Sequence, residues 1–537
     1  MSILKSFPLE RVRSSQELVL KEIESAFSKG YRNVLVEAPV GSGKSAMAIA
    51  AAKFYGDGHI LTPRKSLQDQ YHADFNKESL VTMKGRSSYP CTYPSQSTPE
   101  YEPLVRRIMN GKLVYVTPGN ESCNTGPCLH SGARKRECTV PGDIGQPDQF
   151  PCPYHVAIDT AQKSNIIVHN LHGFIFQTFY SERFQQRKLL VIDEVHELES
   201  TLRGFAEKTI SLPTYIPDGV VLEMEGLVSL DSWADALAPF VSLFKDRVTS
   251  SGTNPKEEYE ALIQSIRDLS GIVGIGFVVD LQRDKHAKRT SIIITPEYVG
   301  NLSEPYILGY GEKRLLMSGT IYSKDLFCRL NGLKPEETAF IKIGSSFPVS
   351  MRPIYMKDEY MVDTSHKMWD ANFTKIIANI KKVMALCPGK GLIHAPSYHA
   401  GLTLYNALKD TGRVITHTKD NFQAVLNSFF AQEGDSVLIS PICQQGVDFK
   451  GDRARFQIIL RVPYPSTSDK LMAKKVKEDF AYYNYQALIT FGQQIGRINR
   501  SEDDFGVTIL MDSRFPAFIS KNRNVLPKWL MDAIVSR

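Results

Sequence analysis

The sequence comprises 537 residues, of which 42% are hydrophobic and 23% are charged, and its formal net charge is +6. A chain of this length exceeds what one hydrophobic core organises, so we expect several domains. No apolar run reaches the roughly 18 residues that a membrane span requires. We therefore expect a soluble, globular protein without a membrane partner. The modest positive charge does not by itself identify a nucleic-acid-binding protein.

The first residues of the chain contain neither an apolar run nor a small-residue cleavage site, so we expect no secretory signal and an intracellular, cytoplasmic location. Five of the eight cysteines gather in one stretch, at Cys91, Cys123, Cys128, Cys138 and Cys152. In a chain without an export signal, this clustering favours a metal site over a disulfide framework.

Short apolar runs bounded by Gly, Pro or polar residues predict two sheets of buried parallel strands. The first set of runs covers residues 34–36, 59–61, 166–168, 189–192 and 315–317. The second set covers residues 391–393, 414–415, 437–439, 458–460 and 508–510. Because helix-length segments separate the runs, we predict an α/β fold with one domain over residues 1–345 and another over 346–537.

Two segments interrupt the first predicted domain. Residues 86–160 are rich in Gly, Pro, Ser and Cys and poor in aliphatic residues, so apolar burial alone would not offset the entropy of ordering them. Residues 200–290 show helical spacing of apolar residues, for example at 233–237 and 259–263, and predict a mostly helical insertion.

Residues 38–45 read APVGSGKS and lie between a predicted strand and a predicted helix, the context of a phosphate-binding loop. Gly41 and Gly43 would let backbone N–H groups close around phosphate, and Lys44 would reach the outer phosphates. The Ser45 hydroxyl would ligate Mg²⁺. We therefore predict an ATP site with Mg²⁺ at this loop.

Two adjacent carboxylates, Asp193 and Glu194, follow the strand predicted at 189–192. Parallel sheets place ligands at this carboxyl edge. Asp193 would hold Mg²⁺ and Glu194 would polarise the attacking water as a general base. The alternative is the acidic start of a solvated helix. We expect His196 to couple this site to other parts of the protein rather than to bind a metal.

Basic and amide side chains elsewhere extend the predicted site. Arg13 and Gln16 are candidates for reading adenine, because an amide both donates and accepts hydrogen bonds. Arg497 and Arg500 would share one face of a helix, and guanidinium groups suit the charge of a transferring phosphoryl group. The alternative for these two arginines is an exposed basic helix.

Several further segments carry a resemblance to a known family. They are residues 61–64 with Gln68 and Gln70, then 317–320, 441–449, 462–465 and 493–500. Together with the loop and the carboxylates, they make the chain resemble the iron–sulfur helicases of superfamily 2, the XPD/DinG group. This resemblance implies two RecA-like domains, with an iron–sulfur cluster insertion at 86–160 and a helical, arch-like insertion at 200–290 in the first.

The resemblance also implies the activity, the partners and further site residues. It implies an ATP-dependent DNA helicase, acting as a monomer, that moves 5′ to 3′ on single-stranded DNA and unwinds forked DNA or DNA–RNA hybrids. Gln493 and Asp448 would join the ATP site, and Thr62, Arg64 and Arg86 would contact DNA. The sequence departs from the family pattern at Gly319, Gln445 and Asn499.

The cysteine-rich insertion resembles the family around residues 84–91, 126–128 and 152–155. This implies that Cys91, Cys128, Cys138 and Cys152 bind a [4Fe–4S] cluster, with Cys123 as the alternative ligand. The same thiolates suit a structural Zn²⁺ site, which stays an alternative.

Two other functions share most of these motifs. One is a DNA-dependent ATPase that translocates or remodels complexes without processive unwinding. The other is a nucleic-acid-binding scaffold with a vestigial ATPase, which the presence of Lys44, Ser45, Glu194 and Arg497 argues against. We expect no room for a fused exonuclease.

Overall fold

The computed structural model describes residues 2–89, 105–109, 112–116, 153–212, 231–232, 235–236, 275–284, 289–443, 447–499, 501 and 503–536. Most of the two predicted insertions, 86–160 and 200–290, therefore lies outside the described residues.

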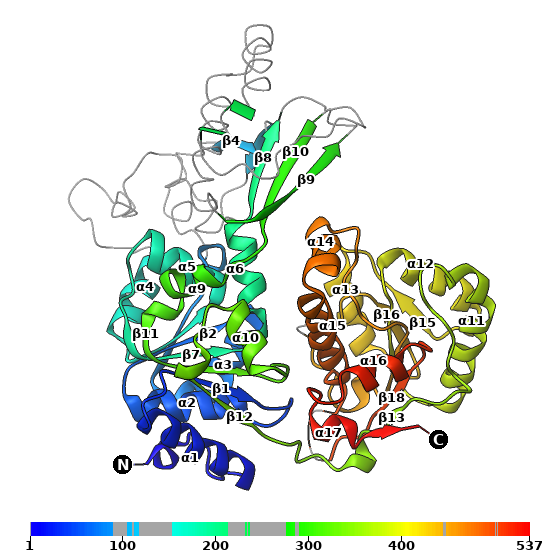
Figure 1. Ribbon diagram of the computed structural model, residues 1–537, viewed down its shortest axis with the longest axis horizontal. Helices are drawn as coiled ribbons and strands as arrows, with labels where there is room; N and C mark the ends of the chain where they lie inside the picture. The colour runs from blue at the N-terminus through cyan, green and yellow to red at the C-terminus, as the bar shows by residue number, and fades with distance from the viewer. Residues whose placement is uncertain are drawn as a thin grey trace, which may run out of the picture. The chain divides into compact units, whose positions relative to one another are not determined.

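The first sheet contains, among the described residues, seven strands in the order β12-β1-β11-β7-β2-β6-β3. Neighbouring strands pair in parallel, for example β2 with both β6 and β7. Helices flank the sheet (Figure 1). The strands are β1 (Asn33–Glu37), β2 (Gly58–Thr62), β3 (Leu80–Met83), β6 (Ile166–Asn170), β7 (Arg187–Asp193), β11 (Gly311–Ser318) and β12 (Thr338–Lys342). The helices are α1 (Ser14–Ser28), α2 (Lys44–Tyr55), α3 (Lys65–Phe75), α4 (Pro153–Lys163), α5 (Leu171–Ile175), α6 (Leu198–Ala206), α9 (Gly300–Tyr306) and α10 (Lys324–Leu330).

The second sheet has the order β15-β16-β14-β17-β18-β13-β19 within the described part of the chain, and its strands are also parallel. Its strands are β13 (Ile354–Tyr355), β14 (Gly391–His394), β15 (Val414–Thr416), β16 (Val437–Ser440), β17 (Phe456–Ile459), β18 (Val507–Leu510) and β19 (Ile534–Val535). Its helices are α11 (Trp369–Leu386), α12 (Tyr398–Leu408), α13 (Phe422–Ala431), α14 (Lys470–Glu478), α15 (Phe480–Ile495), α16 (Phe515–Lys521) and α17 (Lys528–Met531). The predicted α/β class with two parallel sheets is confirmed.

The ends of the predicted helical insertion form strands instead. β8 (Lys208–Leu212), β9 (Phe277–Asp284) and β10 (Arg289–Pro296) pair as an antiparallel sheet in the order β8-β10-β9. β-Branched residues such as Val278, Val279 and Ile292 dominate these ends and favour strands, which the helical spacing farther inside the segment does not reveal. In the cysteine-rich segment, β4 (Val105–Met109) and β5 (Lys112–Val116) form an antiparallel pair.

The chain divides into two compact units. One contains Met1–Val12, Ser45–Asp193 and Glu304–Leu316. The other contains Arg13–Lys44, Glu194–Ser303 and Met317–Arg537. The second unit includes the second sheet, the antiparallel sheet and the start of α2, so most contacts of the candidate site described below lie within it.

Burial explains which strands the sequence predicts. All five residues of β1 and of β2 are buried, because a central strand is covered on both faces, and such strands read as continuous apolar runs. The strands of the two parallel sheets that the sequence did not predict lie at or near sheet edges: β3, β12, β13 and β19. In β12, for example, only Thr338 and Ile341 are buried, and the other three residues are half-buried or exposed.

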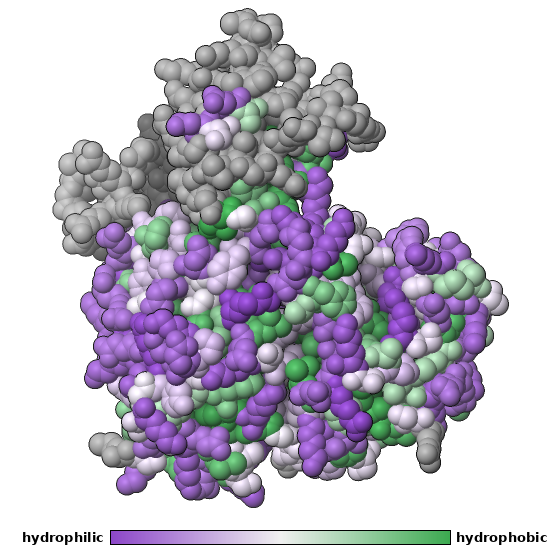
Figure 2. All heavy atoms as spheres, viewed as in Figure 1, coloured by the Kyte–Doolittle hydropathy of each residue, from purple (hydrophilic) through white to green (hydrophobic). Residues whose placement is uncertain are grey.

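Hydrophilic residues cover most of the described surface on the face shown in Figure 2, and hydrophobic residues gather there in small groups. Among the described residues, no helix combines the length and the apolar character that a membrane span needs.

A glycine in β14 tests the packing of the second sheet. A Cβ added at Gly391 would overlap the Phe456 ring, whereas a Cβ at Gly401 in α12 would lie 3.7 Å from its nearest neighbours. We expect Gly391→Ala to lower the free energy of unfolding by about 1–3 kcal/mol because it overpacks the core. Gly401→Ala should be neutral or stabilising by up to about 1 kcal/mol because alanine favours helix.

Urea unfolding of both variants measures this difference. Equal midpoints for Gly391→Ala and the wild type would contradict the packing described for β14.

Candidate active site

The loop between β1 and α2 has the backbone geometry of a phosphate cradle. Gly41 and Gly43 have φ angles of +78° and +80°, a backbone conformation that residues other than glycine rarely adopt. A Cβ at Gly43 would also overlap the Gln16 amide. Both glycines are therefore needed for this loop, which ends at the N-terminus of α2 with Lys44.

Arg13 and Gln16 hold the loop from the start of α1. The Arg13 guanidinium donates a hydrogen bond to the carbonyl of Gly41 at 2.8 Å, and the Gln16 amide donates to the carbonyl of Ser42 at 3.0 Å. The Gln16 carbonyl accepts a hydrogen bond from the backbone N–H of Arg13 at 3.0 Å. Gln16 is buried, so these two side chains fix the loop's shape.

The buried Lys44 forms an ion pair with the partly buried Glu194. The Lys44 ammonium lies 3.5 Å from the Glu194 carboxylate, and the lysine side chain is 9% exposed. Lys44 also donates to the carbonyl of Ala38 at 3.5 Å. Glu194 follows β7 in a left-handed conformation with φ of +54°, a strained backbone state that often marks functional sites.

The charges around Glu194 decide its ionisation. Burial alone would raise the pKa of Glu194, because it disfavours the charged form. The positive charge of Lys44 opposes this most strongly, followed by a hydrogen bond with His196 and the charge of Arg497, and they hold the pKa well below its usual range. Glu194 is therefore ionised at neutral pH.

Asp193 lies beside the hydroxyl of Ser45. The Ser45 Oγ donates to Asp193 Oδ2 at 3.5 Å, and the Tyr71 hydroxyl donates to the same oxygen at 3.0 Å. Asp193 is 2% exposed. Hydroxyl and carboxylate oxygens are the ligands that Mg²⁺ prefers, so this pair suits the metal.

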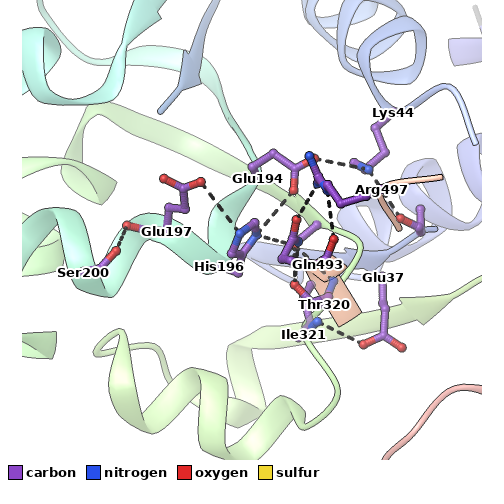
Figure 3. A network of polar contacts seen from close by, with 12 residues as sticks. Glu37, Lys44, Glu194, His196, Glu197, Ser200, Thr320, Ile321, Gln493 and Arg497 are labelled. Carbon is purple, nitrogen blue, oxygen red and sulfur yellow. Dashed lines mark hydrogen bonds and ion pairs between the residues drawn. The ribbon is translucent and has the colours of Figure 1, made fainter. Parts of the chain in front are cut away.

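A chain of polar contacts links Glu194 to α15. His196 Nδ1 lies 3.3 Å from Glu194 Oε2 and 2.8 Å from Ser318 Oγ. Ser318 Oγ accepts from the backbone N–H of Thr320 at 3.1 Å, and the Gln493 amide of α15 donates to Thr320 Oγ1 at 3.1 Å. Figure 3 shows these side chains directed toward one another. His196 contacts both sides of this chain, which fits the predicted coupling role.

Arg497 lies just beyond the end of α15 and is 6% exposed. Its guanidinium donates to the Gln493 carbonyl oxygens of the backbone and the side chain at 2.9 and 3.1 Å, and to the carbonyl of Val447 at 3.0 Å. These bonds hold its charge close enough to lower the pKa of Glu194. The alternative of an exposed basic helix therefore does not hold for Arg497.

Two glycines allow α15 to pack closely against the loops. A Cβ at Gly492 would overlap Tyr322 and Thr320, and one at Gly496 would lie 3.0 Å from Val40 of the phosphate loop. A cavity lies at this contact, lined by residues that include Pro39, Val40, Gly319, Thr320, Gln493 and Gly496.

Other predicted site residues lie elsewhere in the described chain. Thr62 is fully buried and its hydroxyl donates to the carbonyl of Arg64 at 3.2 Å, while Arg64 is half-buried. The half-buried Arg86 lies over the Tyr154 ring, 5.8 Å from its centre. Asp448 is exposed, and its carboxylate accepts from the backbone N–H of Lys450 at 3.2 Å.

The remaining predicted residues lie outside the described residues. They are Arg500, Gln445 and the cysteines Cys91, Cys123, Cys128, Cys138 and Cys152. In the part of the chain that the structure describes, no group of three or more His, Cys, Asp or Glu side chains is arranged to hold a metal ion.

The structure explains one departure from the family pattern. Asn499 has φ of +65°, a conformation that asparagine tolerates better than aliphatic residues do, and its amide donates to the carbonyls of Met351 and Asp504. Nothing explains Gly319, since a Cβ there would make an ordinary contact at 3.5 Å with the Ala38 carbonyl.

Comparison with known proteins identifies the group. A helicase C-terminal domain model matches residues 380–533, and the model described as the res subunit of type III restriction enzymes matches residues 10–226. A probable ATP-dependent helicase of Methanocaldococcus jannaschii is 21% identical over 97% of this chain and 94% of its own length. The Haemophilus influenzae ATP-dependent DNA helicase YoaA is 20% identical over 92% of this chain and 90% of its own length.

The predicted resemblance to the XPD/DinG-like helicases of superfamily 2 is confirmed.

Solved structures of XPD helicases agree on the fold. An XPD helicase structure covers 98% of the chain with a TM-score of 0.62 at 15% identity. The Xpd4 structure of S. tokodaii covers 98% with a TM-score of 0.57. The two parallel sheets are therefore the RecA-like domains that the sequence predicted.

Sequence motifs did not reveal several residues of the helicase site. Tyr71 contacts Asp193, and Glu37 at the end of β1 accepts hydrogen bonds from the backbone N–H groups of Ile321 and Tyr322. Burial raises the pKa of Glu37. The charge of Lys342 and the hydrogen bonds from these N–H groups lower it and offset part of this rise. The sequence did contain one signal for Glu37, because an acidic residue stands at the end of a buried strand directly before the phosphate loop.

The direction of the Glu194 pKa shift gives a test. A carboxylate whose pKa is lowered by folding stabilises the protein above its unfolded pKa, near 4.5, and this contribution is lost as pH falls toward the folded pKa. We therefore expect the melting temperature of the wild type to exceed that of Glu194→Gln most clearly above about pH 5. The difference should shrink as the pH falls below 4.5.

Thermal unfolding of the wild type and of Glu194→Gln between pH 4 and 7 measures this difference in melting temperature. A difference that grows in favour of the wild type toward acidic pH would mean that burial, rather than Lys44, controls this carboxyl.

Proposed function

We propose that the chain uses ATP hydrolysis to move 5′ to 3′ along single-stranded DNA and to separate forked duplex DNA or DNA–RNA hybrids. The observation that carries the proposal is the cluster in which the buried Lys44 pairs with Glu194 while the charge of Arg497 lowers the pKa of the same carboxylate. The relative described as a DNA helicase supports DNA as the substrate.

In this proposal, the phosphate loop and two carboxylates carry out hydrolysis. Backbone N–H groups around Gly41 and Gly43 and the Lys44 ammonium bind the outer phosphates. Ser45 and Asp193 hold Mg²⁺, with Tyr71 orienting Asp193. Bound Mg²⁺ would neutralise phosphate charge as the terminal phosphoryl group leaves.

ATP binding would also prepare the general base. Lys44 would turn from Glu194 toward the phosphates, which removes the strongest charge holding the pKa of Glu194 down. Burial would then raise that pKa, so Glu194 would become a better acceptor for a proton from the attacking water.

The other residues of the proposed ATP site come from α1 and from α15 and the residues after it. Gln493, Arg497 and Arg500 would stabilise the transferring phosphoryl group, because guanidinium groups donate several hydrogen bonds without losing charge. Arg13 and Gln16 would contact adenine while keeping the loop in shape, and Asp448 would contact the nucleotide from the second domain.

The proposed nucleic-acid contacts include residues at the carboxyl edges of both sheets. Arg64 and Arg86 would hold backbone phosphates, and the buried Thr62 would act by fixing the loop that carries Arg64. At the second sheet, a groove is lined by residues that include Trp369, Ser397, Arg461 and Arg514. Arg461 lies 5.2 Å from the centre of the Trp369 ring, so the groove offers a cation and an aromatic face together. This combination suits a single strand bound without sequence preference.

We further propose that Cys91, Cys128, Cys138 and Cys152 bind a [4Fe–4S] cluster, with Cys123 as the alternative ligand. Four thiolates are the donor set that such a cluster requires. Bound there, the cluster would order a segment too polar to fold by apolar burial.

Lys44→Ala tests the proposed activity. Loss of the ammonium should lower DNA-stimulated ATP hydrolysis by about 100-fold or more, because a preorganised charge on the phosphates is lost. Strand separation should be lost with it. Phosphate release with single-stranded DNA and unwinding of forks with 5′ or 3′ tails measure both.

Lys53→Ala is the matched control, because Lys53 lies on the same helix and pairs with Glu78. Unchanged turnover in Lys44→Ala would refute the proposal. Intact DNA-stimulated turnover in the wild type without strand separation would favour a translocase.

Metal analysis tests the cluster. Anaerobically purified protein should contain about four iron and four sulfide per chain. Serine at Cys91, Cys128, Cys138 or Cys152 should remove them, whereas Cys387→Ser, at a free cysteine of α11's C-cap, should not. Zinc without sulfide would overturn the assignment in favour of a structural zinc site.

A further inference from the structure

Helix α15 makes a second polar contact with the segment that follows Glu194. The Tyr482 hydroxyl, in the first turn of α15, donates to both carboxylate oxygens of Glu199 at 3.3 and 3.4 Å. Arg203, one turn along α6, pairs with the same carboxylate. Arg203 also donates to the carbonyl of Pro296 at the end of β10. The three side chains therefore join α15, α6 and β10.

This contact is shielded from water. Tyr482 is 2% exposed and Glu199 is 6% exposed. Burial and the neighbouring carboxylate raise the pKa of Tyr482, so its hydroxyl stays protonated and remains a donor. Separating Glu199 from its partners would leave its buried charge without compensation. This cost holds the three side chains together.

Ion pairs around the start of α15 strengthen the same attachment. Lys474 of α14 lies 2.7 Å from Glu297, and Lys470 donates to the carbonyl of Val279 in β9 at 2.9 Å. Asp479, which caps α15, pairs with Arg329 of α10 at 3.0 Å. None of these groups belongs to the nucleotide site.

The other end of α15 depends on the nucleotide site. Gln493 contacts Thr320, and Arg497 acts on Glu194, so an ATP phosphate would change these contacts directly. Tyr482 and Gln493 are eleven positions apart, about 16 Å along a helix. The N-terminal end of α15 is thus fixed by the buried contacts of Tyr482. Its C-terminal end lies at the site where the charge would change when ATP binds or is hydrolysed.

We propose that Glu199, Arg203 and Tyr482 form the pivot on which α15 turns as the nucleotide site closes and opens. The pivot positions Gln493 and Arg497 for hydrolysis without touching ATP. Because it also joins β10, it transmits each turn of α15 to the antiparallel sheet at the base of the 200–290 insertion. This inference rests on the proposed function of the site.

Tyr482→Phe tests the pivot because it removes one hydroxyl and keeps the ring. The KM for ATP should stay within about twofold of the wild type, since the phosphate loop is unchanged. The kcat should fall about fivefold or more, because α15 less often reaches the position in which Gln493 and Arg497 are placed for hydrolysis. Unwinding should fall further than ATP hydrolysis does, so more ATP is consumed per base pair separated.

Tyr360→Phe is the matched control. Its hydroxyl also contacts a glutamate side chain, that of Glu359, but it lies away from α15 and the nucleotide site. We expect it to keep wild-type kcat and coupling, with a melting temperature that serves as the reference for loss of one tyrosine hydroxyl.

Glu199→Gln, alone and combined with Tyr482→Phe, completes the test. If the residues act as one pivot, their effects on kcat are not additive, and the double variant is about as slow as the slower single one. Wild-type kcat in Tyr482→Phe, or a lower melting temperature with unchanged kcat, overturns the pivot. A wild-type protein without DNA-stimulated ATPase refutes the proposed function instead.

Discussion

An ion pair between the buried Lys44 ammonium and the partly buried Glu194 carboxylate sets the conditions for the rest of the site. Taking the lysine charge out of water without a partner costs free energy, so Lys44 requires an anion such as Glu194 beside it. The requirement fixes the loop after β1, where Gly41 and Gly43 have positive φ angles, and the left-handed turn that carries Glu194. In the proposed mechanism, a triphosphate would replace Glu194 as the partner of Lys44, and Glu194 would then act as the base.

Helix α15 extends this constraint to the second sheet. Its C-terminal half contacts the loop of residues 318–322 through Gln493 and Gly492, and its first turn contacts α6 through Tyr482. The helix is buried along most of its length, where its apolar residues pack against a core that includes Phe515 and Phe518. In the proposed pivot, a helix packed this tightly would move as one body, so a change at Glu194 would reach the contacts of Tyr482.

The sequence predicted the features whose signal is local. Continuous apolar runs predicted the central strands, and the glycines, Lys44 and the paired carboxylates predicted the candidate nucleotide site, because each signal depends on neighbours in the chain. Edge strands such as β12 and the antiparallel sheet were missed because half-buried strands lack a continuous apolar run. The contacts of Tyr71 with Asp193 and of Tyr482 with Glu199 join residues more than 100 positions apart. No local pattern marks such pairs, so only the fold reveals them.

In the proposed mechanism, the Arg497 charge belongs to the same hydrolytic site as Lys44. The most direct measurement compares Arg497→Ala with the wild type in ATP hydrolysis and in binding of a non-hydrolysable ATP analogue. Because a transition-state charge is lost while the phosphate loop is intact, kcat should fall by about 1000-fold and analogue affinity by less than about tenfold. A kcat within about twofold of the wild type would contradict the account, since it would mean that Arg497 does not reach the transferring phosphoryl group.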